Sequence, residues 1–174
     1  ATLGNSAVAA IASLVVLVHA LAQTQPLRVV MVHWLWVPGH VIDVAFWLDP
    51  LSAVMATMTC ILGFVVAWFS VAYLHREPGF GRYFMLVNLF LAGMQVLALG
   101  DGFMLLFLGW EWVGLCSALL IGFFHERAAP VRAGARAFIT NRFGDFGLLT
   151  ASMFAAHEFG GDGWAAMNAG AGHL

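Results

Sequence analysis

One carboxylate lies inside a stretch of sequence that is otherwise free of charge. The stretch LFLGWEWVGLCSALLIGF, residues 106–123, carries Glu111 and no other acidic or basic side chain. It is long enough for most of a membrane crossing. An acid at the centre of a spanning helix costs about 2.5–3.5 kcal/mol on insertion scales. Glu111 therefore needs a compensating environment inside the protein.

The spacing of small residues indicates where that environment lies. On a helical wheel, the face that carries Glu111 also carries Gly114, Ala118 and Gly122. Small residues four apart let membrane helices approach closely, so we expect Glu111 to point into a helix contact and away from lipid. Burial opposes the ionised form and a nearby cation favours it, so the carboxyl could exchange a proton. The residues alone also allow a permanently protonated Glu111 with one interhelical hydrogen bond.

A second charged group lies further along the chain, in the sequence FITNRFGDFGLL. Arg142 and Asp145 are about one helical turn apart and can pair, which reduces the cost of burying both. Asn141, Asp145 and Ser152 fall on one side of the same helix and form a polar stripe. The pair could serve a proton path, or it could be structural, with Arg142 snorkelling to the interface. Both interpretations remain open at this point.

Other polar residues in the apolar segments predict structural contacts. Asn88 and Gln95 are seven residues apart and are expected to hydrogen-bond to neighbouring helices. Asp49 and Asp101 each precede an apolar run and are expected to cap the following helix at its N-terminus.

Histidine and cysteine give little indication of a metal or redox centre. His19 and His157 lie near the ends of two apolar segments and could together ligate a haem, although interfacial histidines are usually hydrated or hydrogen-bonded. Cys60 and Cys116 both fall inside apolar segments and form no CxxC pair. We therefore expect neither a disulfide nor a zinc site.

The composition is that of a membrane protein. Of 174 residues, 62% are hydrophobic and 9% are charged, whereas soluble domains carry about a quarter charged residues. All seven basic residues are arginine and the net charge is −2, so no basic patch for nucleic acid is expected. We predict an all-α polytopic membrane protein that contacts the lipid bilayer.

The apolar runs predict one domain over residues 1–174 with five spans, about 4–22, 50–74, 83–100, 103–124 and 134–158. The first run lacks the basic region of a signal peptide and is expected to be a retained span. Residues 28–47 suggest a β-hairpin at the membrane surface, with Trp34, Trp36 and Trp47 in the aromatic belt. Residues 159–174 suggest a flexible tail without a closing element, and the whole sequence suggests a fragment of a longer polypeptide.

The arginines predict the orientation. One side of the predicted bundle carries Arg76, Arg82, Arg127, Arg132 and Arg136, and the other side carries only Arg28. By the positive-inside rule the arginine-rich loops are cytoplasmic and the hairpin is external.

The charged segments stand within longer motifs. GWEWVGLCSALLIGF resembles the GWEGVGLCSYLLIGF-type stretch of the antiporter-like membrane subunits of respiratory complex I, the subunit L family of NADH-quinone oxidoreductases. FWLDPLSAVMATM and GRYFMLVNLFLAGMQVLAL upstream, and ARAFITNRFGDFGLL downstream, are similar to that family in unbroken order over about residues 46–150.

The resemblance implies a fold and a set of site residues. The family's fold is a bundle of about sixteen spans with two inverted five-helix repeats and an external hairpin, of which this sequence would hold the second to sixth spans. Glu111 corresponds to the family's buried acid on the proton path, whose partner lysine would lie beyond residue 174. Arg142 and Asp145 correspond to its RxGD pair. Trp112 replaces the usual Gly and Ala118 the usual aromatic residue, so packing near Glu111 is expected to differ.

The implied function is proton translocation in a bacterial inner membrane, coupled to electron transfer from NADH to quinone. The partners would be other antiporter-like subunits of the membrane arm. No cofactor site is visible in this chain, so FMN, iron–sulphur clusters and quinone are expected in other subunits. The alternatives are a subunit of a cation/proton antiporter or of a proton-driven inorganic-carbon uptake system, and a non-conducting or haem-binding bundle.

Overall fold

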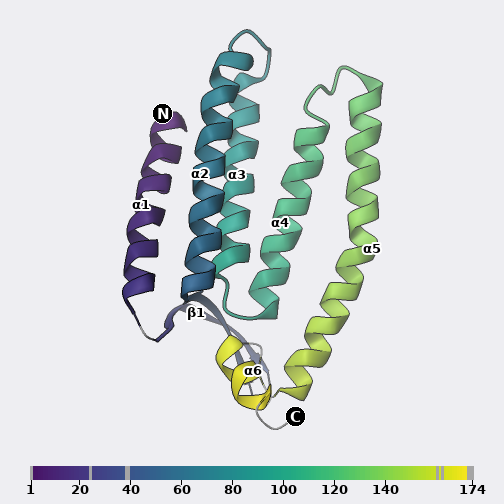
Figure 1. Cartoon of the computed structure of the whole chain (residues 1–174). Coiled ribbons are helices and arrows are strands. Elements are labelled where there is room, and N and C mark those ends of the chain that lie inside the picture. The colour runs from purple at the N-terminus through teal and green to yellow at the C-terminus, as the bar shows by residue number, and fades with distance from the viewer. Residues whose placement is uncertain (1, 24, 38–39, 160, 162, 172–174) are drawn as a thin grey trace.

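The computed structural model describes residues 2–23, 25–37, 40–159, 161 and 163–171, and it is mostly helical (Figure 1). The elements in chain order are α1 (Thr2–Ala22), β1 (Leu27–Val37), β2 (His40–Leu48), α2 (Pro50–Tyr73), α3 (Phe80–Leu99), α4 (Phe103–Ile121), α5 (Ala128–Glu158) and α6 (Trp164–Ala171). The two strands form an antiparallel hairpin. Residues 38–39, between the two strands, lie outside the described residues. The helical fold class with one β-hairpin is confirmed.

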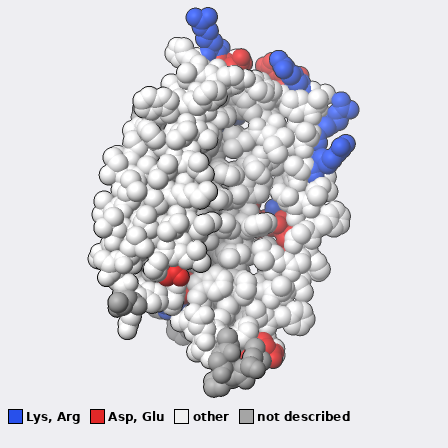
Figure 2. Space-filling model, viewed as in Figure 1, with Lys and Arg blue, Asp and Glu red and all other residues white. Residues whose placement is uncertain are grey.

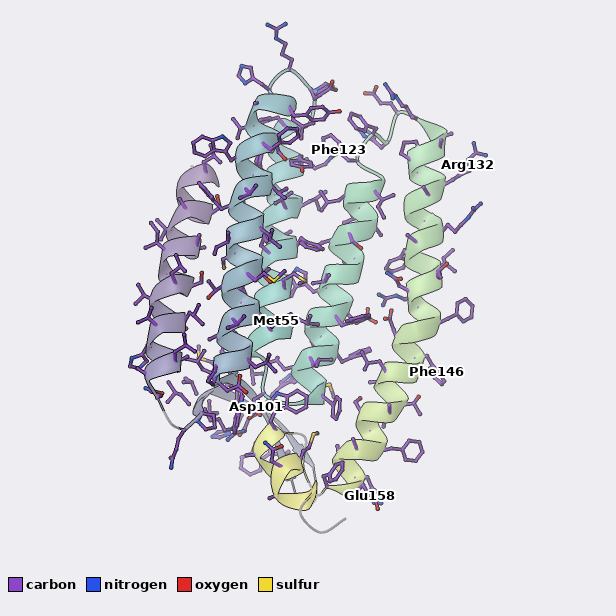
Figure 3. The ribbon with its side chains drawn as sticks, in the orientation of Figure 1. Met55, Asp101, Phe123, Arg132, Phe146 and Glu158 are labelled. Atoms are coloured by element: carbon purple, nitrogen blue, oxygen red, sulfur yellow. The ribbon has the colours of Figure 1, made fainter. Side chains whose placement is uncertain are left out.

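The helices α1 to α5 form an open row in which each packs against its neighbour in the sequence. Large apolar side chains cover the outside of the row, and Phe143 and Phe146 on α5 are 81% and 74% exposed. Figure 3 shows Phe146 pointing away from the other helices. The apolar exterior is expected of a protein that faces lipid or further protein.

Four helices of the described chain, α1 to α4, are long and apolar enough to cross a membrane. The fifth predicted span, 134–158, falls within α5, which begins earlier, at Ala128, and has 31 residues. It is not among the four, because its arginines and acids lower its apolar character. The chain is thus a multi-pass membrane protein. Its helix α5, at the edge of the row, is more polar than the other four.

The predicted cap at Asp49 is confirmed. The backbone N–H of Ser52 donates to Asp49 Oδ1 at 2.7 Å, and the N–H of Asp49 donates to Ser52 Oγ at 2.9 Å. This reciprocal capping box, with Pro50 in the first turn, fixes the start of α2 directly after the hairpin.

The predicted cap at Asp101 is wrong, because this residue connects three elements instead. The N-cap of α4 is Gly102, at φ +99°, a backbone conformation that favours glycine. The Asp101 side chain is fully buried and accepts from Arg28 Nε at 2.5 Å and from the backbone N–H of Trp164 at 2.8 Å. Its own N–H donates to the carbonyl of Ala45 at 2.9 Å. Figure 3 shows Asp101 where the hairpin and α6 meet the helix row.

The predicted flexible tail, 159–174, is wrong for residues 164–171, which form α6. Trp164 anchors this helix: its indole N–H donates to the carbonyl of Gly100 at 2.8 Å, and its ring packs edge-on against Phe103. One tryptophan and the Asp101 carboxylate therefore order a segment that small residues would otherwise leave loose.

Glycines bring the backbones of α3, α4 and α5 close together. A Cβ added at Gly109 of α4 would lie 2.7 Å from the backbone nitrogen of Leu97 in α3. A Cβ added at Gly134 of α5 would lie 2.7 Å from the carbonyl oxygen of Ala118 in α4. Glycine at these two positions is thus a condition for the observed packing of α4.

We predict that Gly134→Ala loosens the contact between α4 and α5 and destabilises the protein by about 2 kcal/mol, the usual cost of overpacking. The control is Gly144→Ala on the same helix, where an added Cβ meets nothing within 4 Å. It should leave stability unchanged or raise it by up to about 1 kcal/mol, since alanine is the better helix former. Thermal unfolding in detergent compares the two. An equal loss in both would show that the close approach is not limiting.

We also predict that Asp101→Asn releases the hairpin and α6, at a cost of about 3 kcal/mol, because Arg28 then loses its buried anion. Limited proteolysis of the hairpin should accelerate strongly. Glu158→Gln removes an exposed carboxylate at the same end of the molecule and should have no effect. Unchanged protection in Asp101→Asn would mean that backbone contacts alone hold these elements.

Candidate functional site

A single guanidinium joins two carboxylates between α4 and α5. Arg142 Nη1 donates to Glu111 Oε2 across the helix contact, and Arg142 Nε lies 3.0 Å from Asp145 Oδ2 on its own helix. The side chains are 35% exposed for Arg142, 24% for Glu111 and 5% for Asp145. The structure therefore brings together all three residues that the sequence singled out, including the link from Glu111 to Arg142, which the sequence did not predict.

The small residues near Glu111 form the α4–α5 contact, as their spacing predicts. A Cβ added at Gly114 would lie 3.6 Å from Arg142 Nη2, so glycine leaves room for the guanidinium. One turn further on, Ala118 is buried and its carbonyl lies against Gly134. Ala118 also lines a cavity of about 360 Å³ between the two helices, at the position where the family resemblance leads one to expect an aromatic residue.

Asp145 has a second partner that the sequence analysis missed. The indole N–H of Trp110 donates to Asp145 Oδ1 at 2.8 Å. The sequence pattern assigns Trp110 no polar contact, although this residue directly precedes Glu111. The general need of a tryptophan N–H for a partner inside a membrane protein was the signal that could have indicated it, but only the helix packing shows which acceptor it finds.

The guanidinium of Arg142 packs against an aromatic ring, but not all of its N–H groups have hydrogen-bond acceptors in the part of the chain that the structure describes. It lies over the ring of Phe138, 4.6 Å from the centroid. Its Nε and Nη2 and the Oδ2 of Asp145 are buried without a hydrogen-bond partner among the described residues, so the 3.0 Å contact to Asp145 is an ion pair without hydrogen-bond geometry. With both acids ionised the group carries a net charge of −1, which one added proton would neutralise.

The predicted polar stripe on α5 is only partly buried. Asp145 and Ser152 are buried, and Ser152 Oγ donates to the carbonyl of Leu149 in its own helix at 2.7 Å. Asn141 is exposed and lies near Gly114 of α4. Asp145 is thus the member of the stripe that joins the charged group.

The remaining intramembrane polar residues make mainly structural contacts. Gln95 Nε2 donates to the carbonyl of Ala56 on α2 at 3.2 Å, as predicted for a bond between helices. Asn88 lines a cavity of about 340 Å³ that α1, α2 and α3 share. His19 contacts Gln23 in the turn after α1.

A shared haem is excluded by the arrangement of the helices. His19 belongs to α1 and His157 to α5, and Figure 1 shows these helices at opposite ends of the row. Among the described residues, no group of three or more histidine, cysteine or acidic side chains could hold a metal ion.

A separate charged cluster lies on the hairpin. Arg28 reaches from buried Asp101 to Asp43 at 3.1 Å, and His33 Nδ1 lies 2.6 Å from the other oxygen of Asp43. The hydrogen bond with His33, and after it that with Arg28, holds the pKa of Asp43 below its usual value. The pKa of Arg28 is raised, chiefly by the hydrogen bond to Asp101.

Most of the arginines gather at the end of the molecule opposite the hairpin. Figure 2 shows basic groups concentrated at the end where the α2–α3 and α4–α5 loops lie in Figure 1, and charged atoms of both signs about halfway along the same face. The sequence placed Arg76, Arg82, Arg127 and Arg132 together, and Figure 3 shows Arg132 near this end.

Two family models match consecutive parts of the chain. The model described as NADH-Ubiquinone oxidoreductase (complex I), chain 5 N-terminus matches residues 34–84, and the model described as NADH:quinone oxidoreductase/Mrp antiporter, TM matches residues 101–167.

Among curated proteins, NADH-quinone oxidoreductase subunit L of Buchnera aphidicola subsp. Baizongia pistaciae is 40% identical over 129 residues, which are 73% of this chain and 21% of that protein. Subunit L of Escherichia coli K12 is 38% identical over 129 residues, 73% and 21% of the two chains. Subunit L of Mycobacterium tuberculosis H37Rv is 36% identical over 137 residues, 78% and 22% of the two chains. The chain thus spans about one fifth of the length of these relatives.

A solved structure shares the fold. The Mrp complex from Dietzia sp. DQ12-45-1b contains a chain that superposes with a TM-score of 0.82 at 27% sequence identity, over 95% of this chain and 18% of that one. The overall fold of this chain therefore has a counterpart in an antiporter complex.

The lowered pKa of Asp43 predicts how the hairpin responds to acid. Because the folded hairpin holds this carboxyl ionised below the unfolded pKa of 3.8, its contribution to stability is complete above that value. It is lost as the pH falls through the lower folded pKa. Cleavage of the hairpin by an acid-active protease should therefore rise only below about pH 4. Asp43→Asn lacks this carboxylate, so the protection that it gives the hairpin against cleavage should be missing at every pH. Equal cleavage rates for the variant and the wild type across the pH range would contradict the stabilising role of Asp43.

Proposed function

This chain belongs to the family of antiporter-like membrane subunits that NADH:quinone oxidoreductases share with Mrp antiporters, and we propose that it is part of a proton-translocating subunit of an NADH-quinone oxidoreductase. The observation that carries the proposal is the sharing of Arg142 by Glu111 and Asp145 between two closely packed helices. Two acids and one base in an apolar surrounding form a site at which one proton can be held or released.

The contacts suggest how the proton affinity of Glu111 changes. While Arg142 donates to Glu111, the carboxylate is stabilised and holds no proton. When the guanidinium moves toward Asp145, only 3.0 Å away, Glu111 loses its cation and takes up a proton to avoid an unpaired charge in the membrane. A further cation that approaches Glu111 would expel that proton. Movement of one side chain between two neighbouring acids thus changes proton occupancy with little change in the backbone.

The chain would contribute proton transfer and no redox chemistry. NADH oxidation and quinone reduction would take place in other subunits, which would hold FMN and iron–sulphur clusters. Its partners would be other antiporter-like subunits of the membrane arm. The membrane would be a bacterial inner membrane, with the arginine-rich end of Figure 2 at the cytoplasm.

A cation/proton antiporter is the second candidate function. The superposition on a chain of the Mrp complex favours it, and the same three charged side chains could couple proton release to cation movement. The subunit L relatives, more similar in sequence at 36–40% identity, favour the oxidoreductase. Proton movement driven by NADH, as opposed to a sodium gradient, distinguishes the two.

We predict that Glu111→Gln in the full-length subunit of the assembled complex lowers NADH-driven proton uptake by sealed vesicles roughly tenfold or more, as expected for loss of a proton-transfer group. Glu126→Gln, in the exposed loop before α5, is the matched control and should pump as the wild type does. Complex abundance and NADH oxidation with an artificial electron acceptor should be unchanged in both variants. Normal proton uptake per NADH in Glu111→Gln would refute the assigned role.

A further inference from the structure

Trp110 contacts both the charged group and a cavity on the other side of α4. Its indole N–H donates to Asp145 Oδ1 at 2.8 Å, while its ring lines a cavity of about 510 Å³. Trp110 is 50% exposed, whereas Asp145 is 4% exposed. The indole therefore lies against the acid on one side and against open space on the other.

We propose that Trp110 is a positioning residue for proton transfer, which holds the Asp145 carboxylate where it can compete with Glu111 for Arg142. The proposal rests on the proposed function and adds to it the residue that sets the balance between the two acids. It depends on donor chemistry, on the geometry of Arg142 and on the cavity.

The donor chemistry is one-directional. A tryptophan N–H can only donate and a carboxylate oxygen accepts, so the indole holds Asp145 Oδ1 in one position as its acceptor. The other charged groups that face Asp145 are Arg142 on its own helix and, through Arg142, Glu111 on α4. Without the indole donor, Asp145 would rely on the 3.0 Å ion pair, which lacks hydrogen-bond geometry.

The contacts of Arg142 show why the competition between Glu111 and Asp145 for this cation matters. The guanidinium has a hydrogen bond to Glu111 and only an ion pair to Asp145. If the Asp145 carboxylate lost this position, the cation would remain with Glu111, and proton uptake at Glu111 would be suppressed. The N–H of Trp110 thus maintains the second position that Arg142 needs in order to move.

The cavity explains why the donor is tryptophan. Its wall includes Trp47, Trp164 and Met55, and it lies between the hairpin, α2, α3, α4 and α6. A large ring at 110 separates this space from Asp145, so that the acid receives one fixed donor in place of exchanging solvent. A smaller polar residue could donate a hydrogen bond but would not form this wall.

The test compares pH profiles of NADH-driven proton uptake in vesicles that contain the assembled complex. Trp110→Phe keeps an aromatic wall and removes the donor. The pH of half-maximal uptake should move by about one unit, as expected for loss of a hydrogen bond to a charged group. Trp112→Phe is the matched control: its indole lies against Gly93 of α3, and its profile should equal that of the wild type. Identical profiles for Trp110→Phe and the wild type overturn the proposal.

If Trp110→Phe does not assemble, a second pair of variants tests the proposal. Trp110→Gln retains an N–H donor and Trp110→Leu does not, although the two side chains are similar in size. A pH profile that is displaced in Trp110→Leu and restored toward wild type in Trp110→Gln supports the positioning role. Equal pH profiles for the two variants overturn it. If the wild type takes up no protons with NADH, the proposed function has failed separately. The same profiles are then measured with sodium-driven proton movement, and the same outcomes decide the role of Trp110.

Discussion

The interaction on which the site depends is the sharing of one guanidinium by two carboxylates within an apolar helix pair. Burying Glu111 alone would be costly, and Arg142 reduces that cost only because α5 lies directly beside α4. The same cation must also serve Asp145, so neither acid is fully neutralised. With both acids ionised, the group carries a net charge of −1 in an apolar surrounding, which one added proton would neutralise.

The packing of α4 provides the necessary proximity. Gly109 brings the α4 backbone against α3, and Gly134 brings α5 against Ala118 of α4. Gly114 leaves the space that Arg142 occupies. The two departures from the family pattern fit this arrangement: Ala118 lies at the close approach, and Trp112 packs over Gly93 of α3, away from the charged group.

The hairpin end of the molecule is organised by a different ion pair. Buried Asp101 connects the hairpin to α6 through Arg28 and Trp164. The cavity beside Trp110 is lined by Trp164 as well, so the ordering of α6 also shapes the space behind the charged group. At the outer end of this cluster, the hydrogen bonds with His33 and Arg28 hold the pKa of Asp43 below its usual value, so the contribution of this carboxylate to hairpin stability persists until it is protonated.

The sequence by itself determined the helical membrane fold, the hairpin and the cap at Asp49, and it singled out Glu111, Arg142 and Asp145, which the structure brings together. These follow from local properties: hydropathy, residue spacing along one helix, and the cost of a charge in an apolar run. The sequence could not show that Arg142 pairs with Glu111, that Trp110 donates to Asp145, or that Asp101 holds Arg28 and α6 instead of capping α4. Each of these contacts joins residues 31 to 73 positions apart. Only the packing of the helices and the hairpin decides which donor meets which acceptor, because a local pattern predicts the face a side chain occupies but not the neighbour it meets.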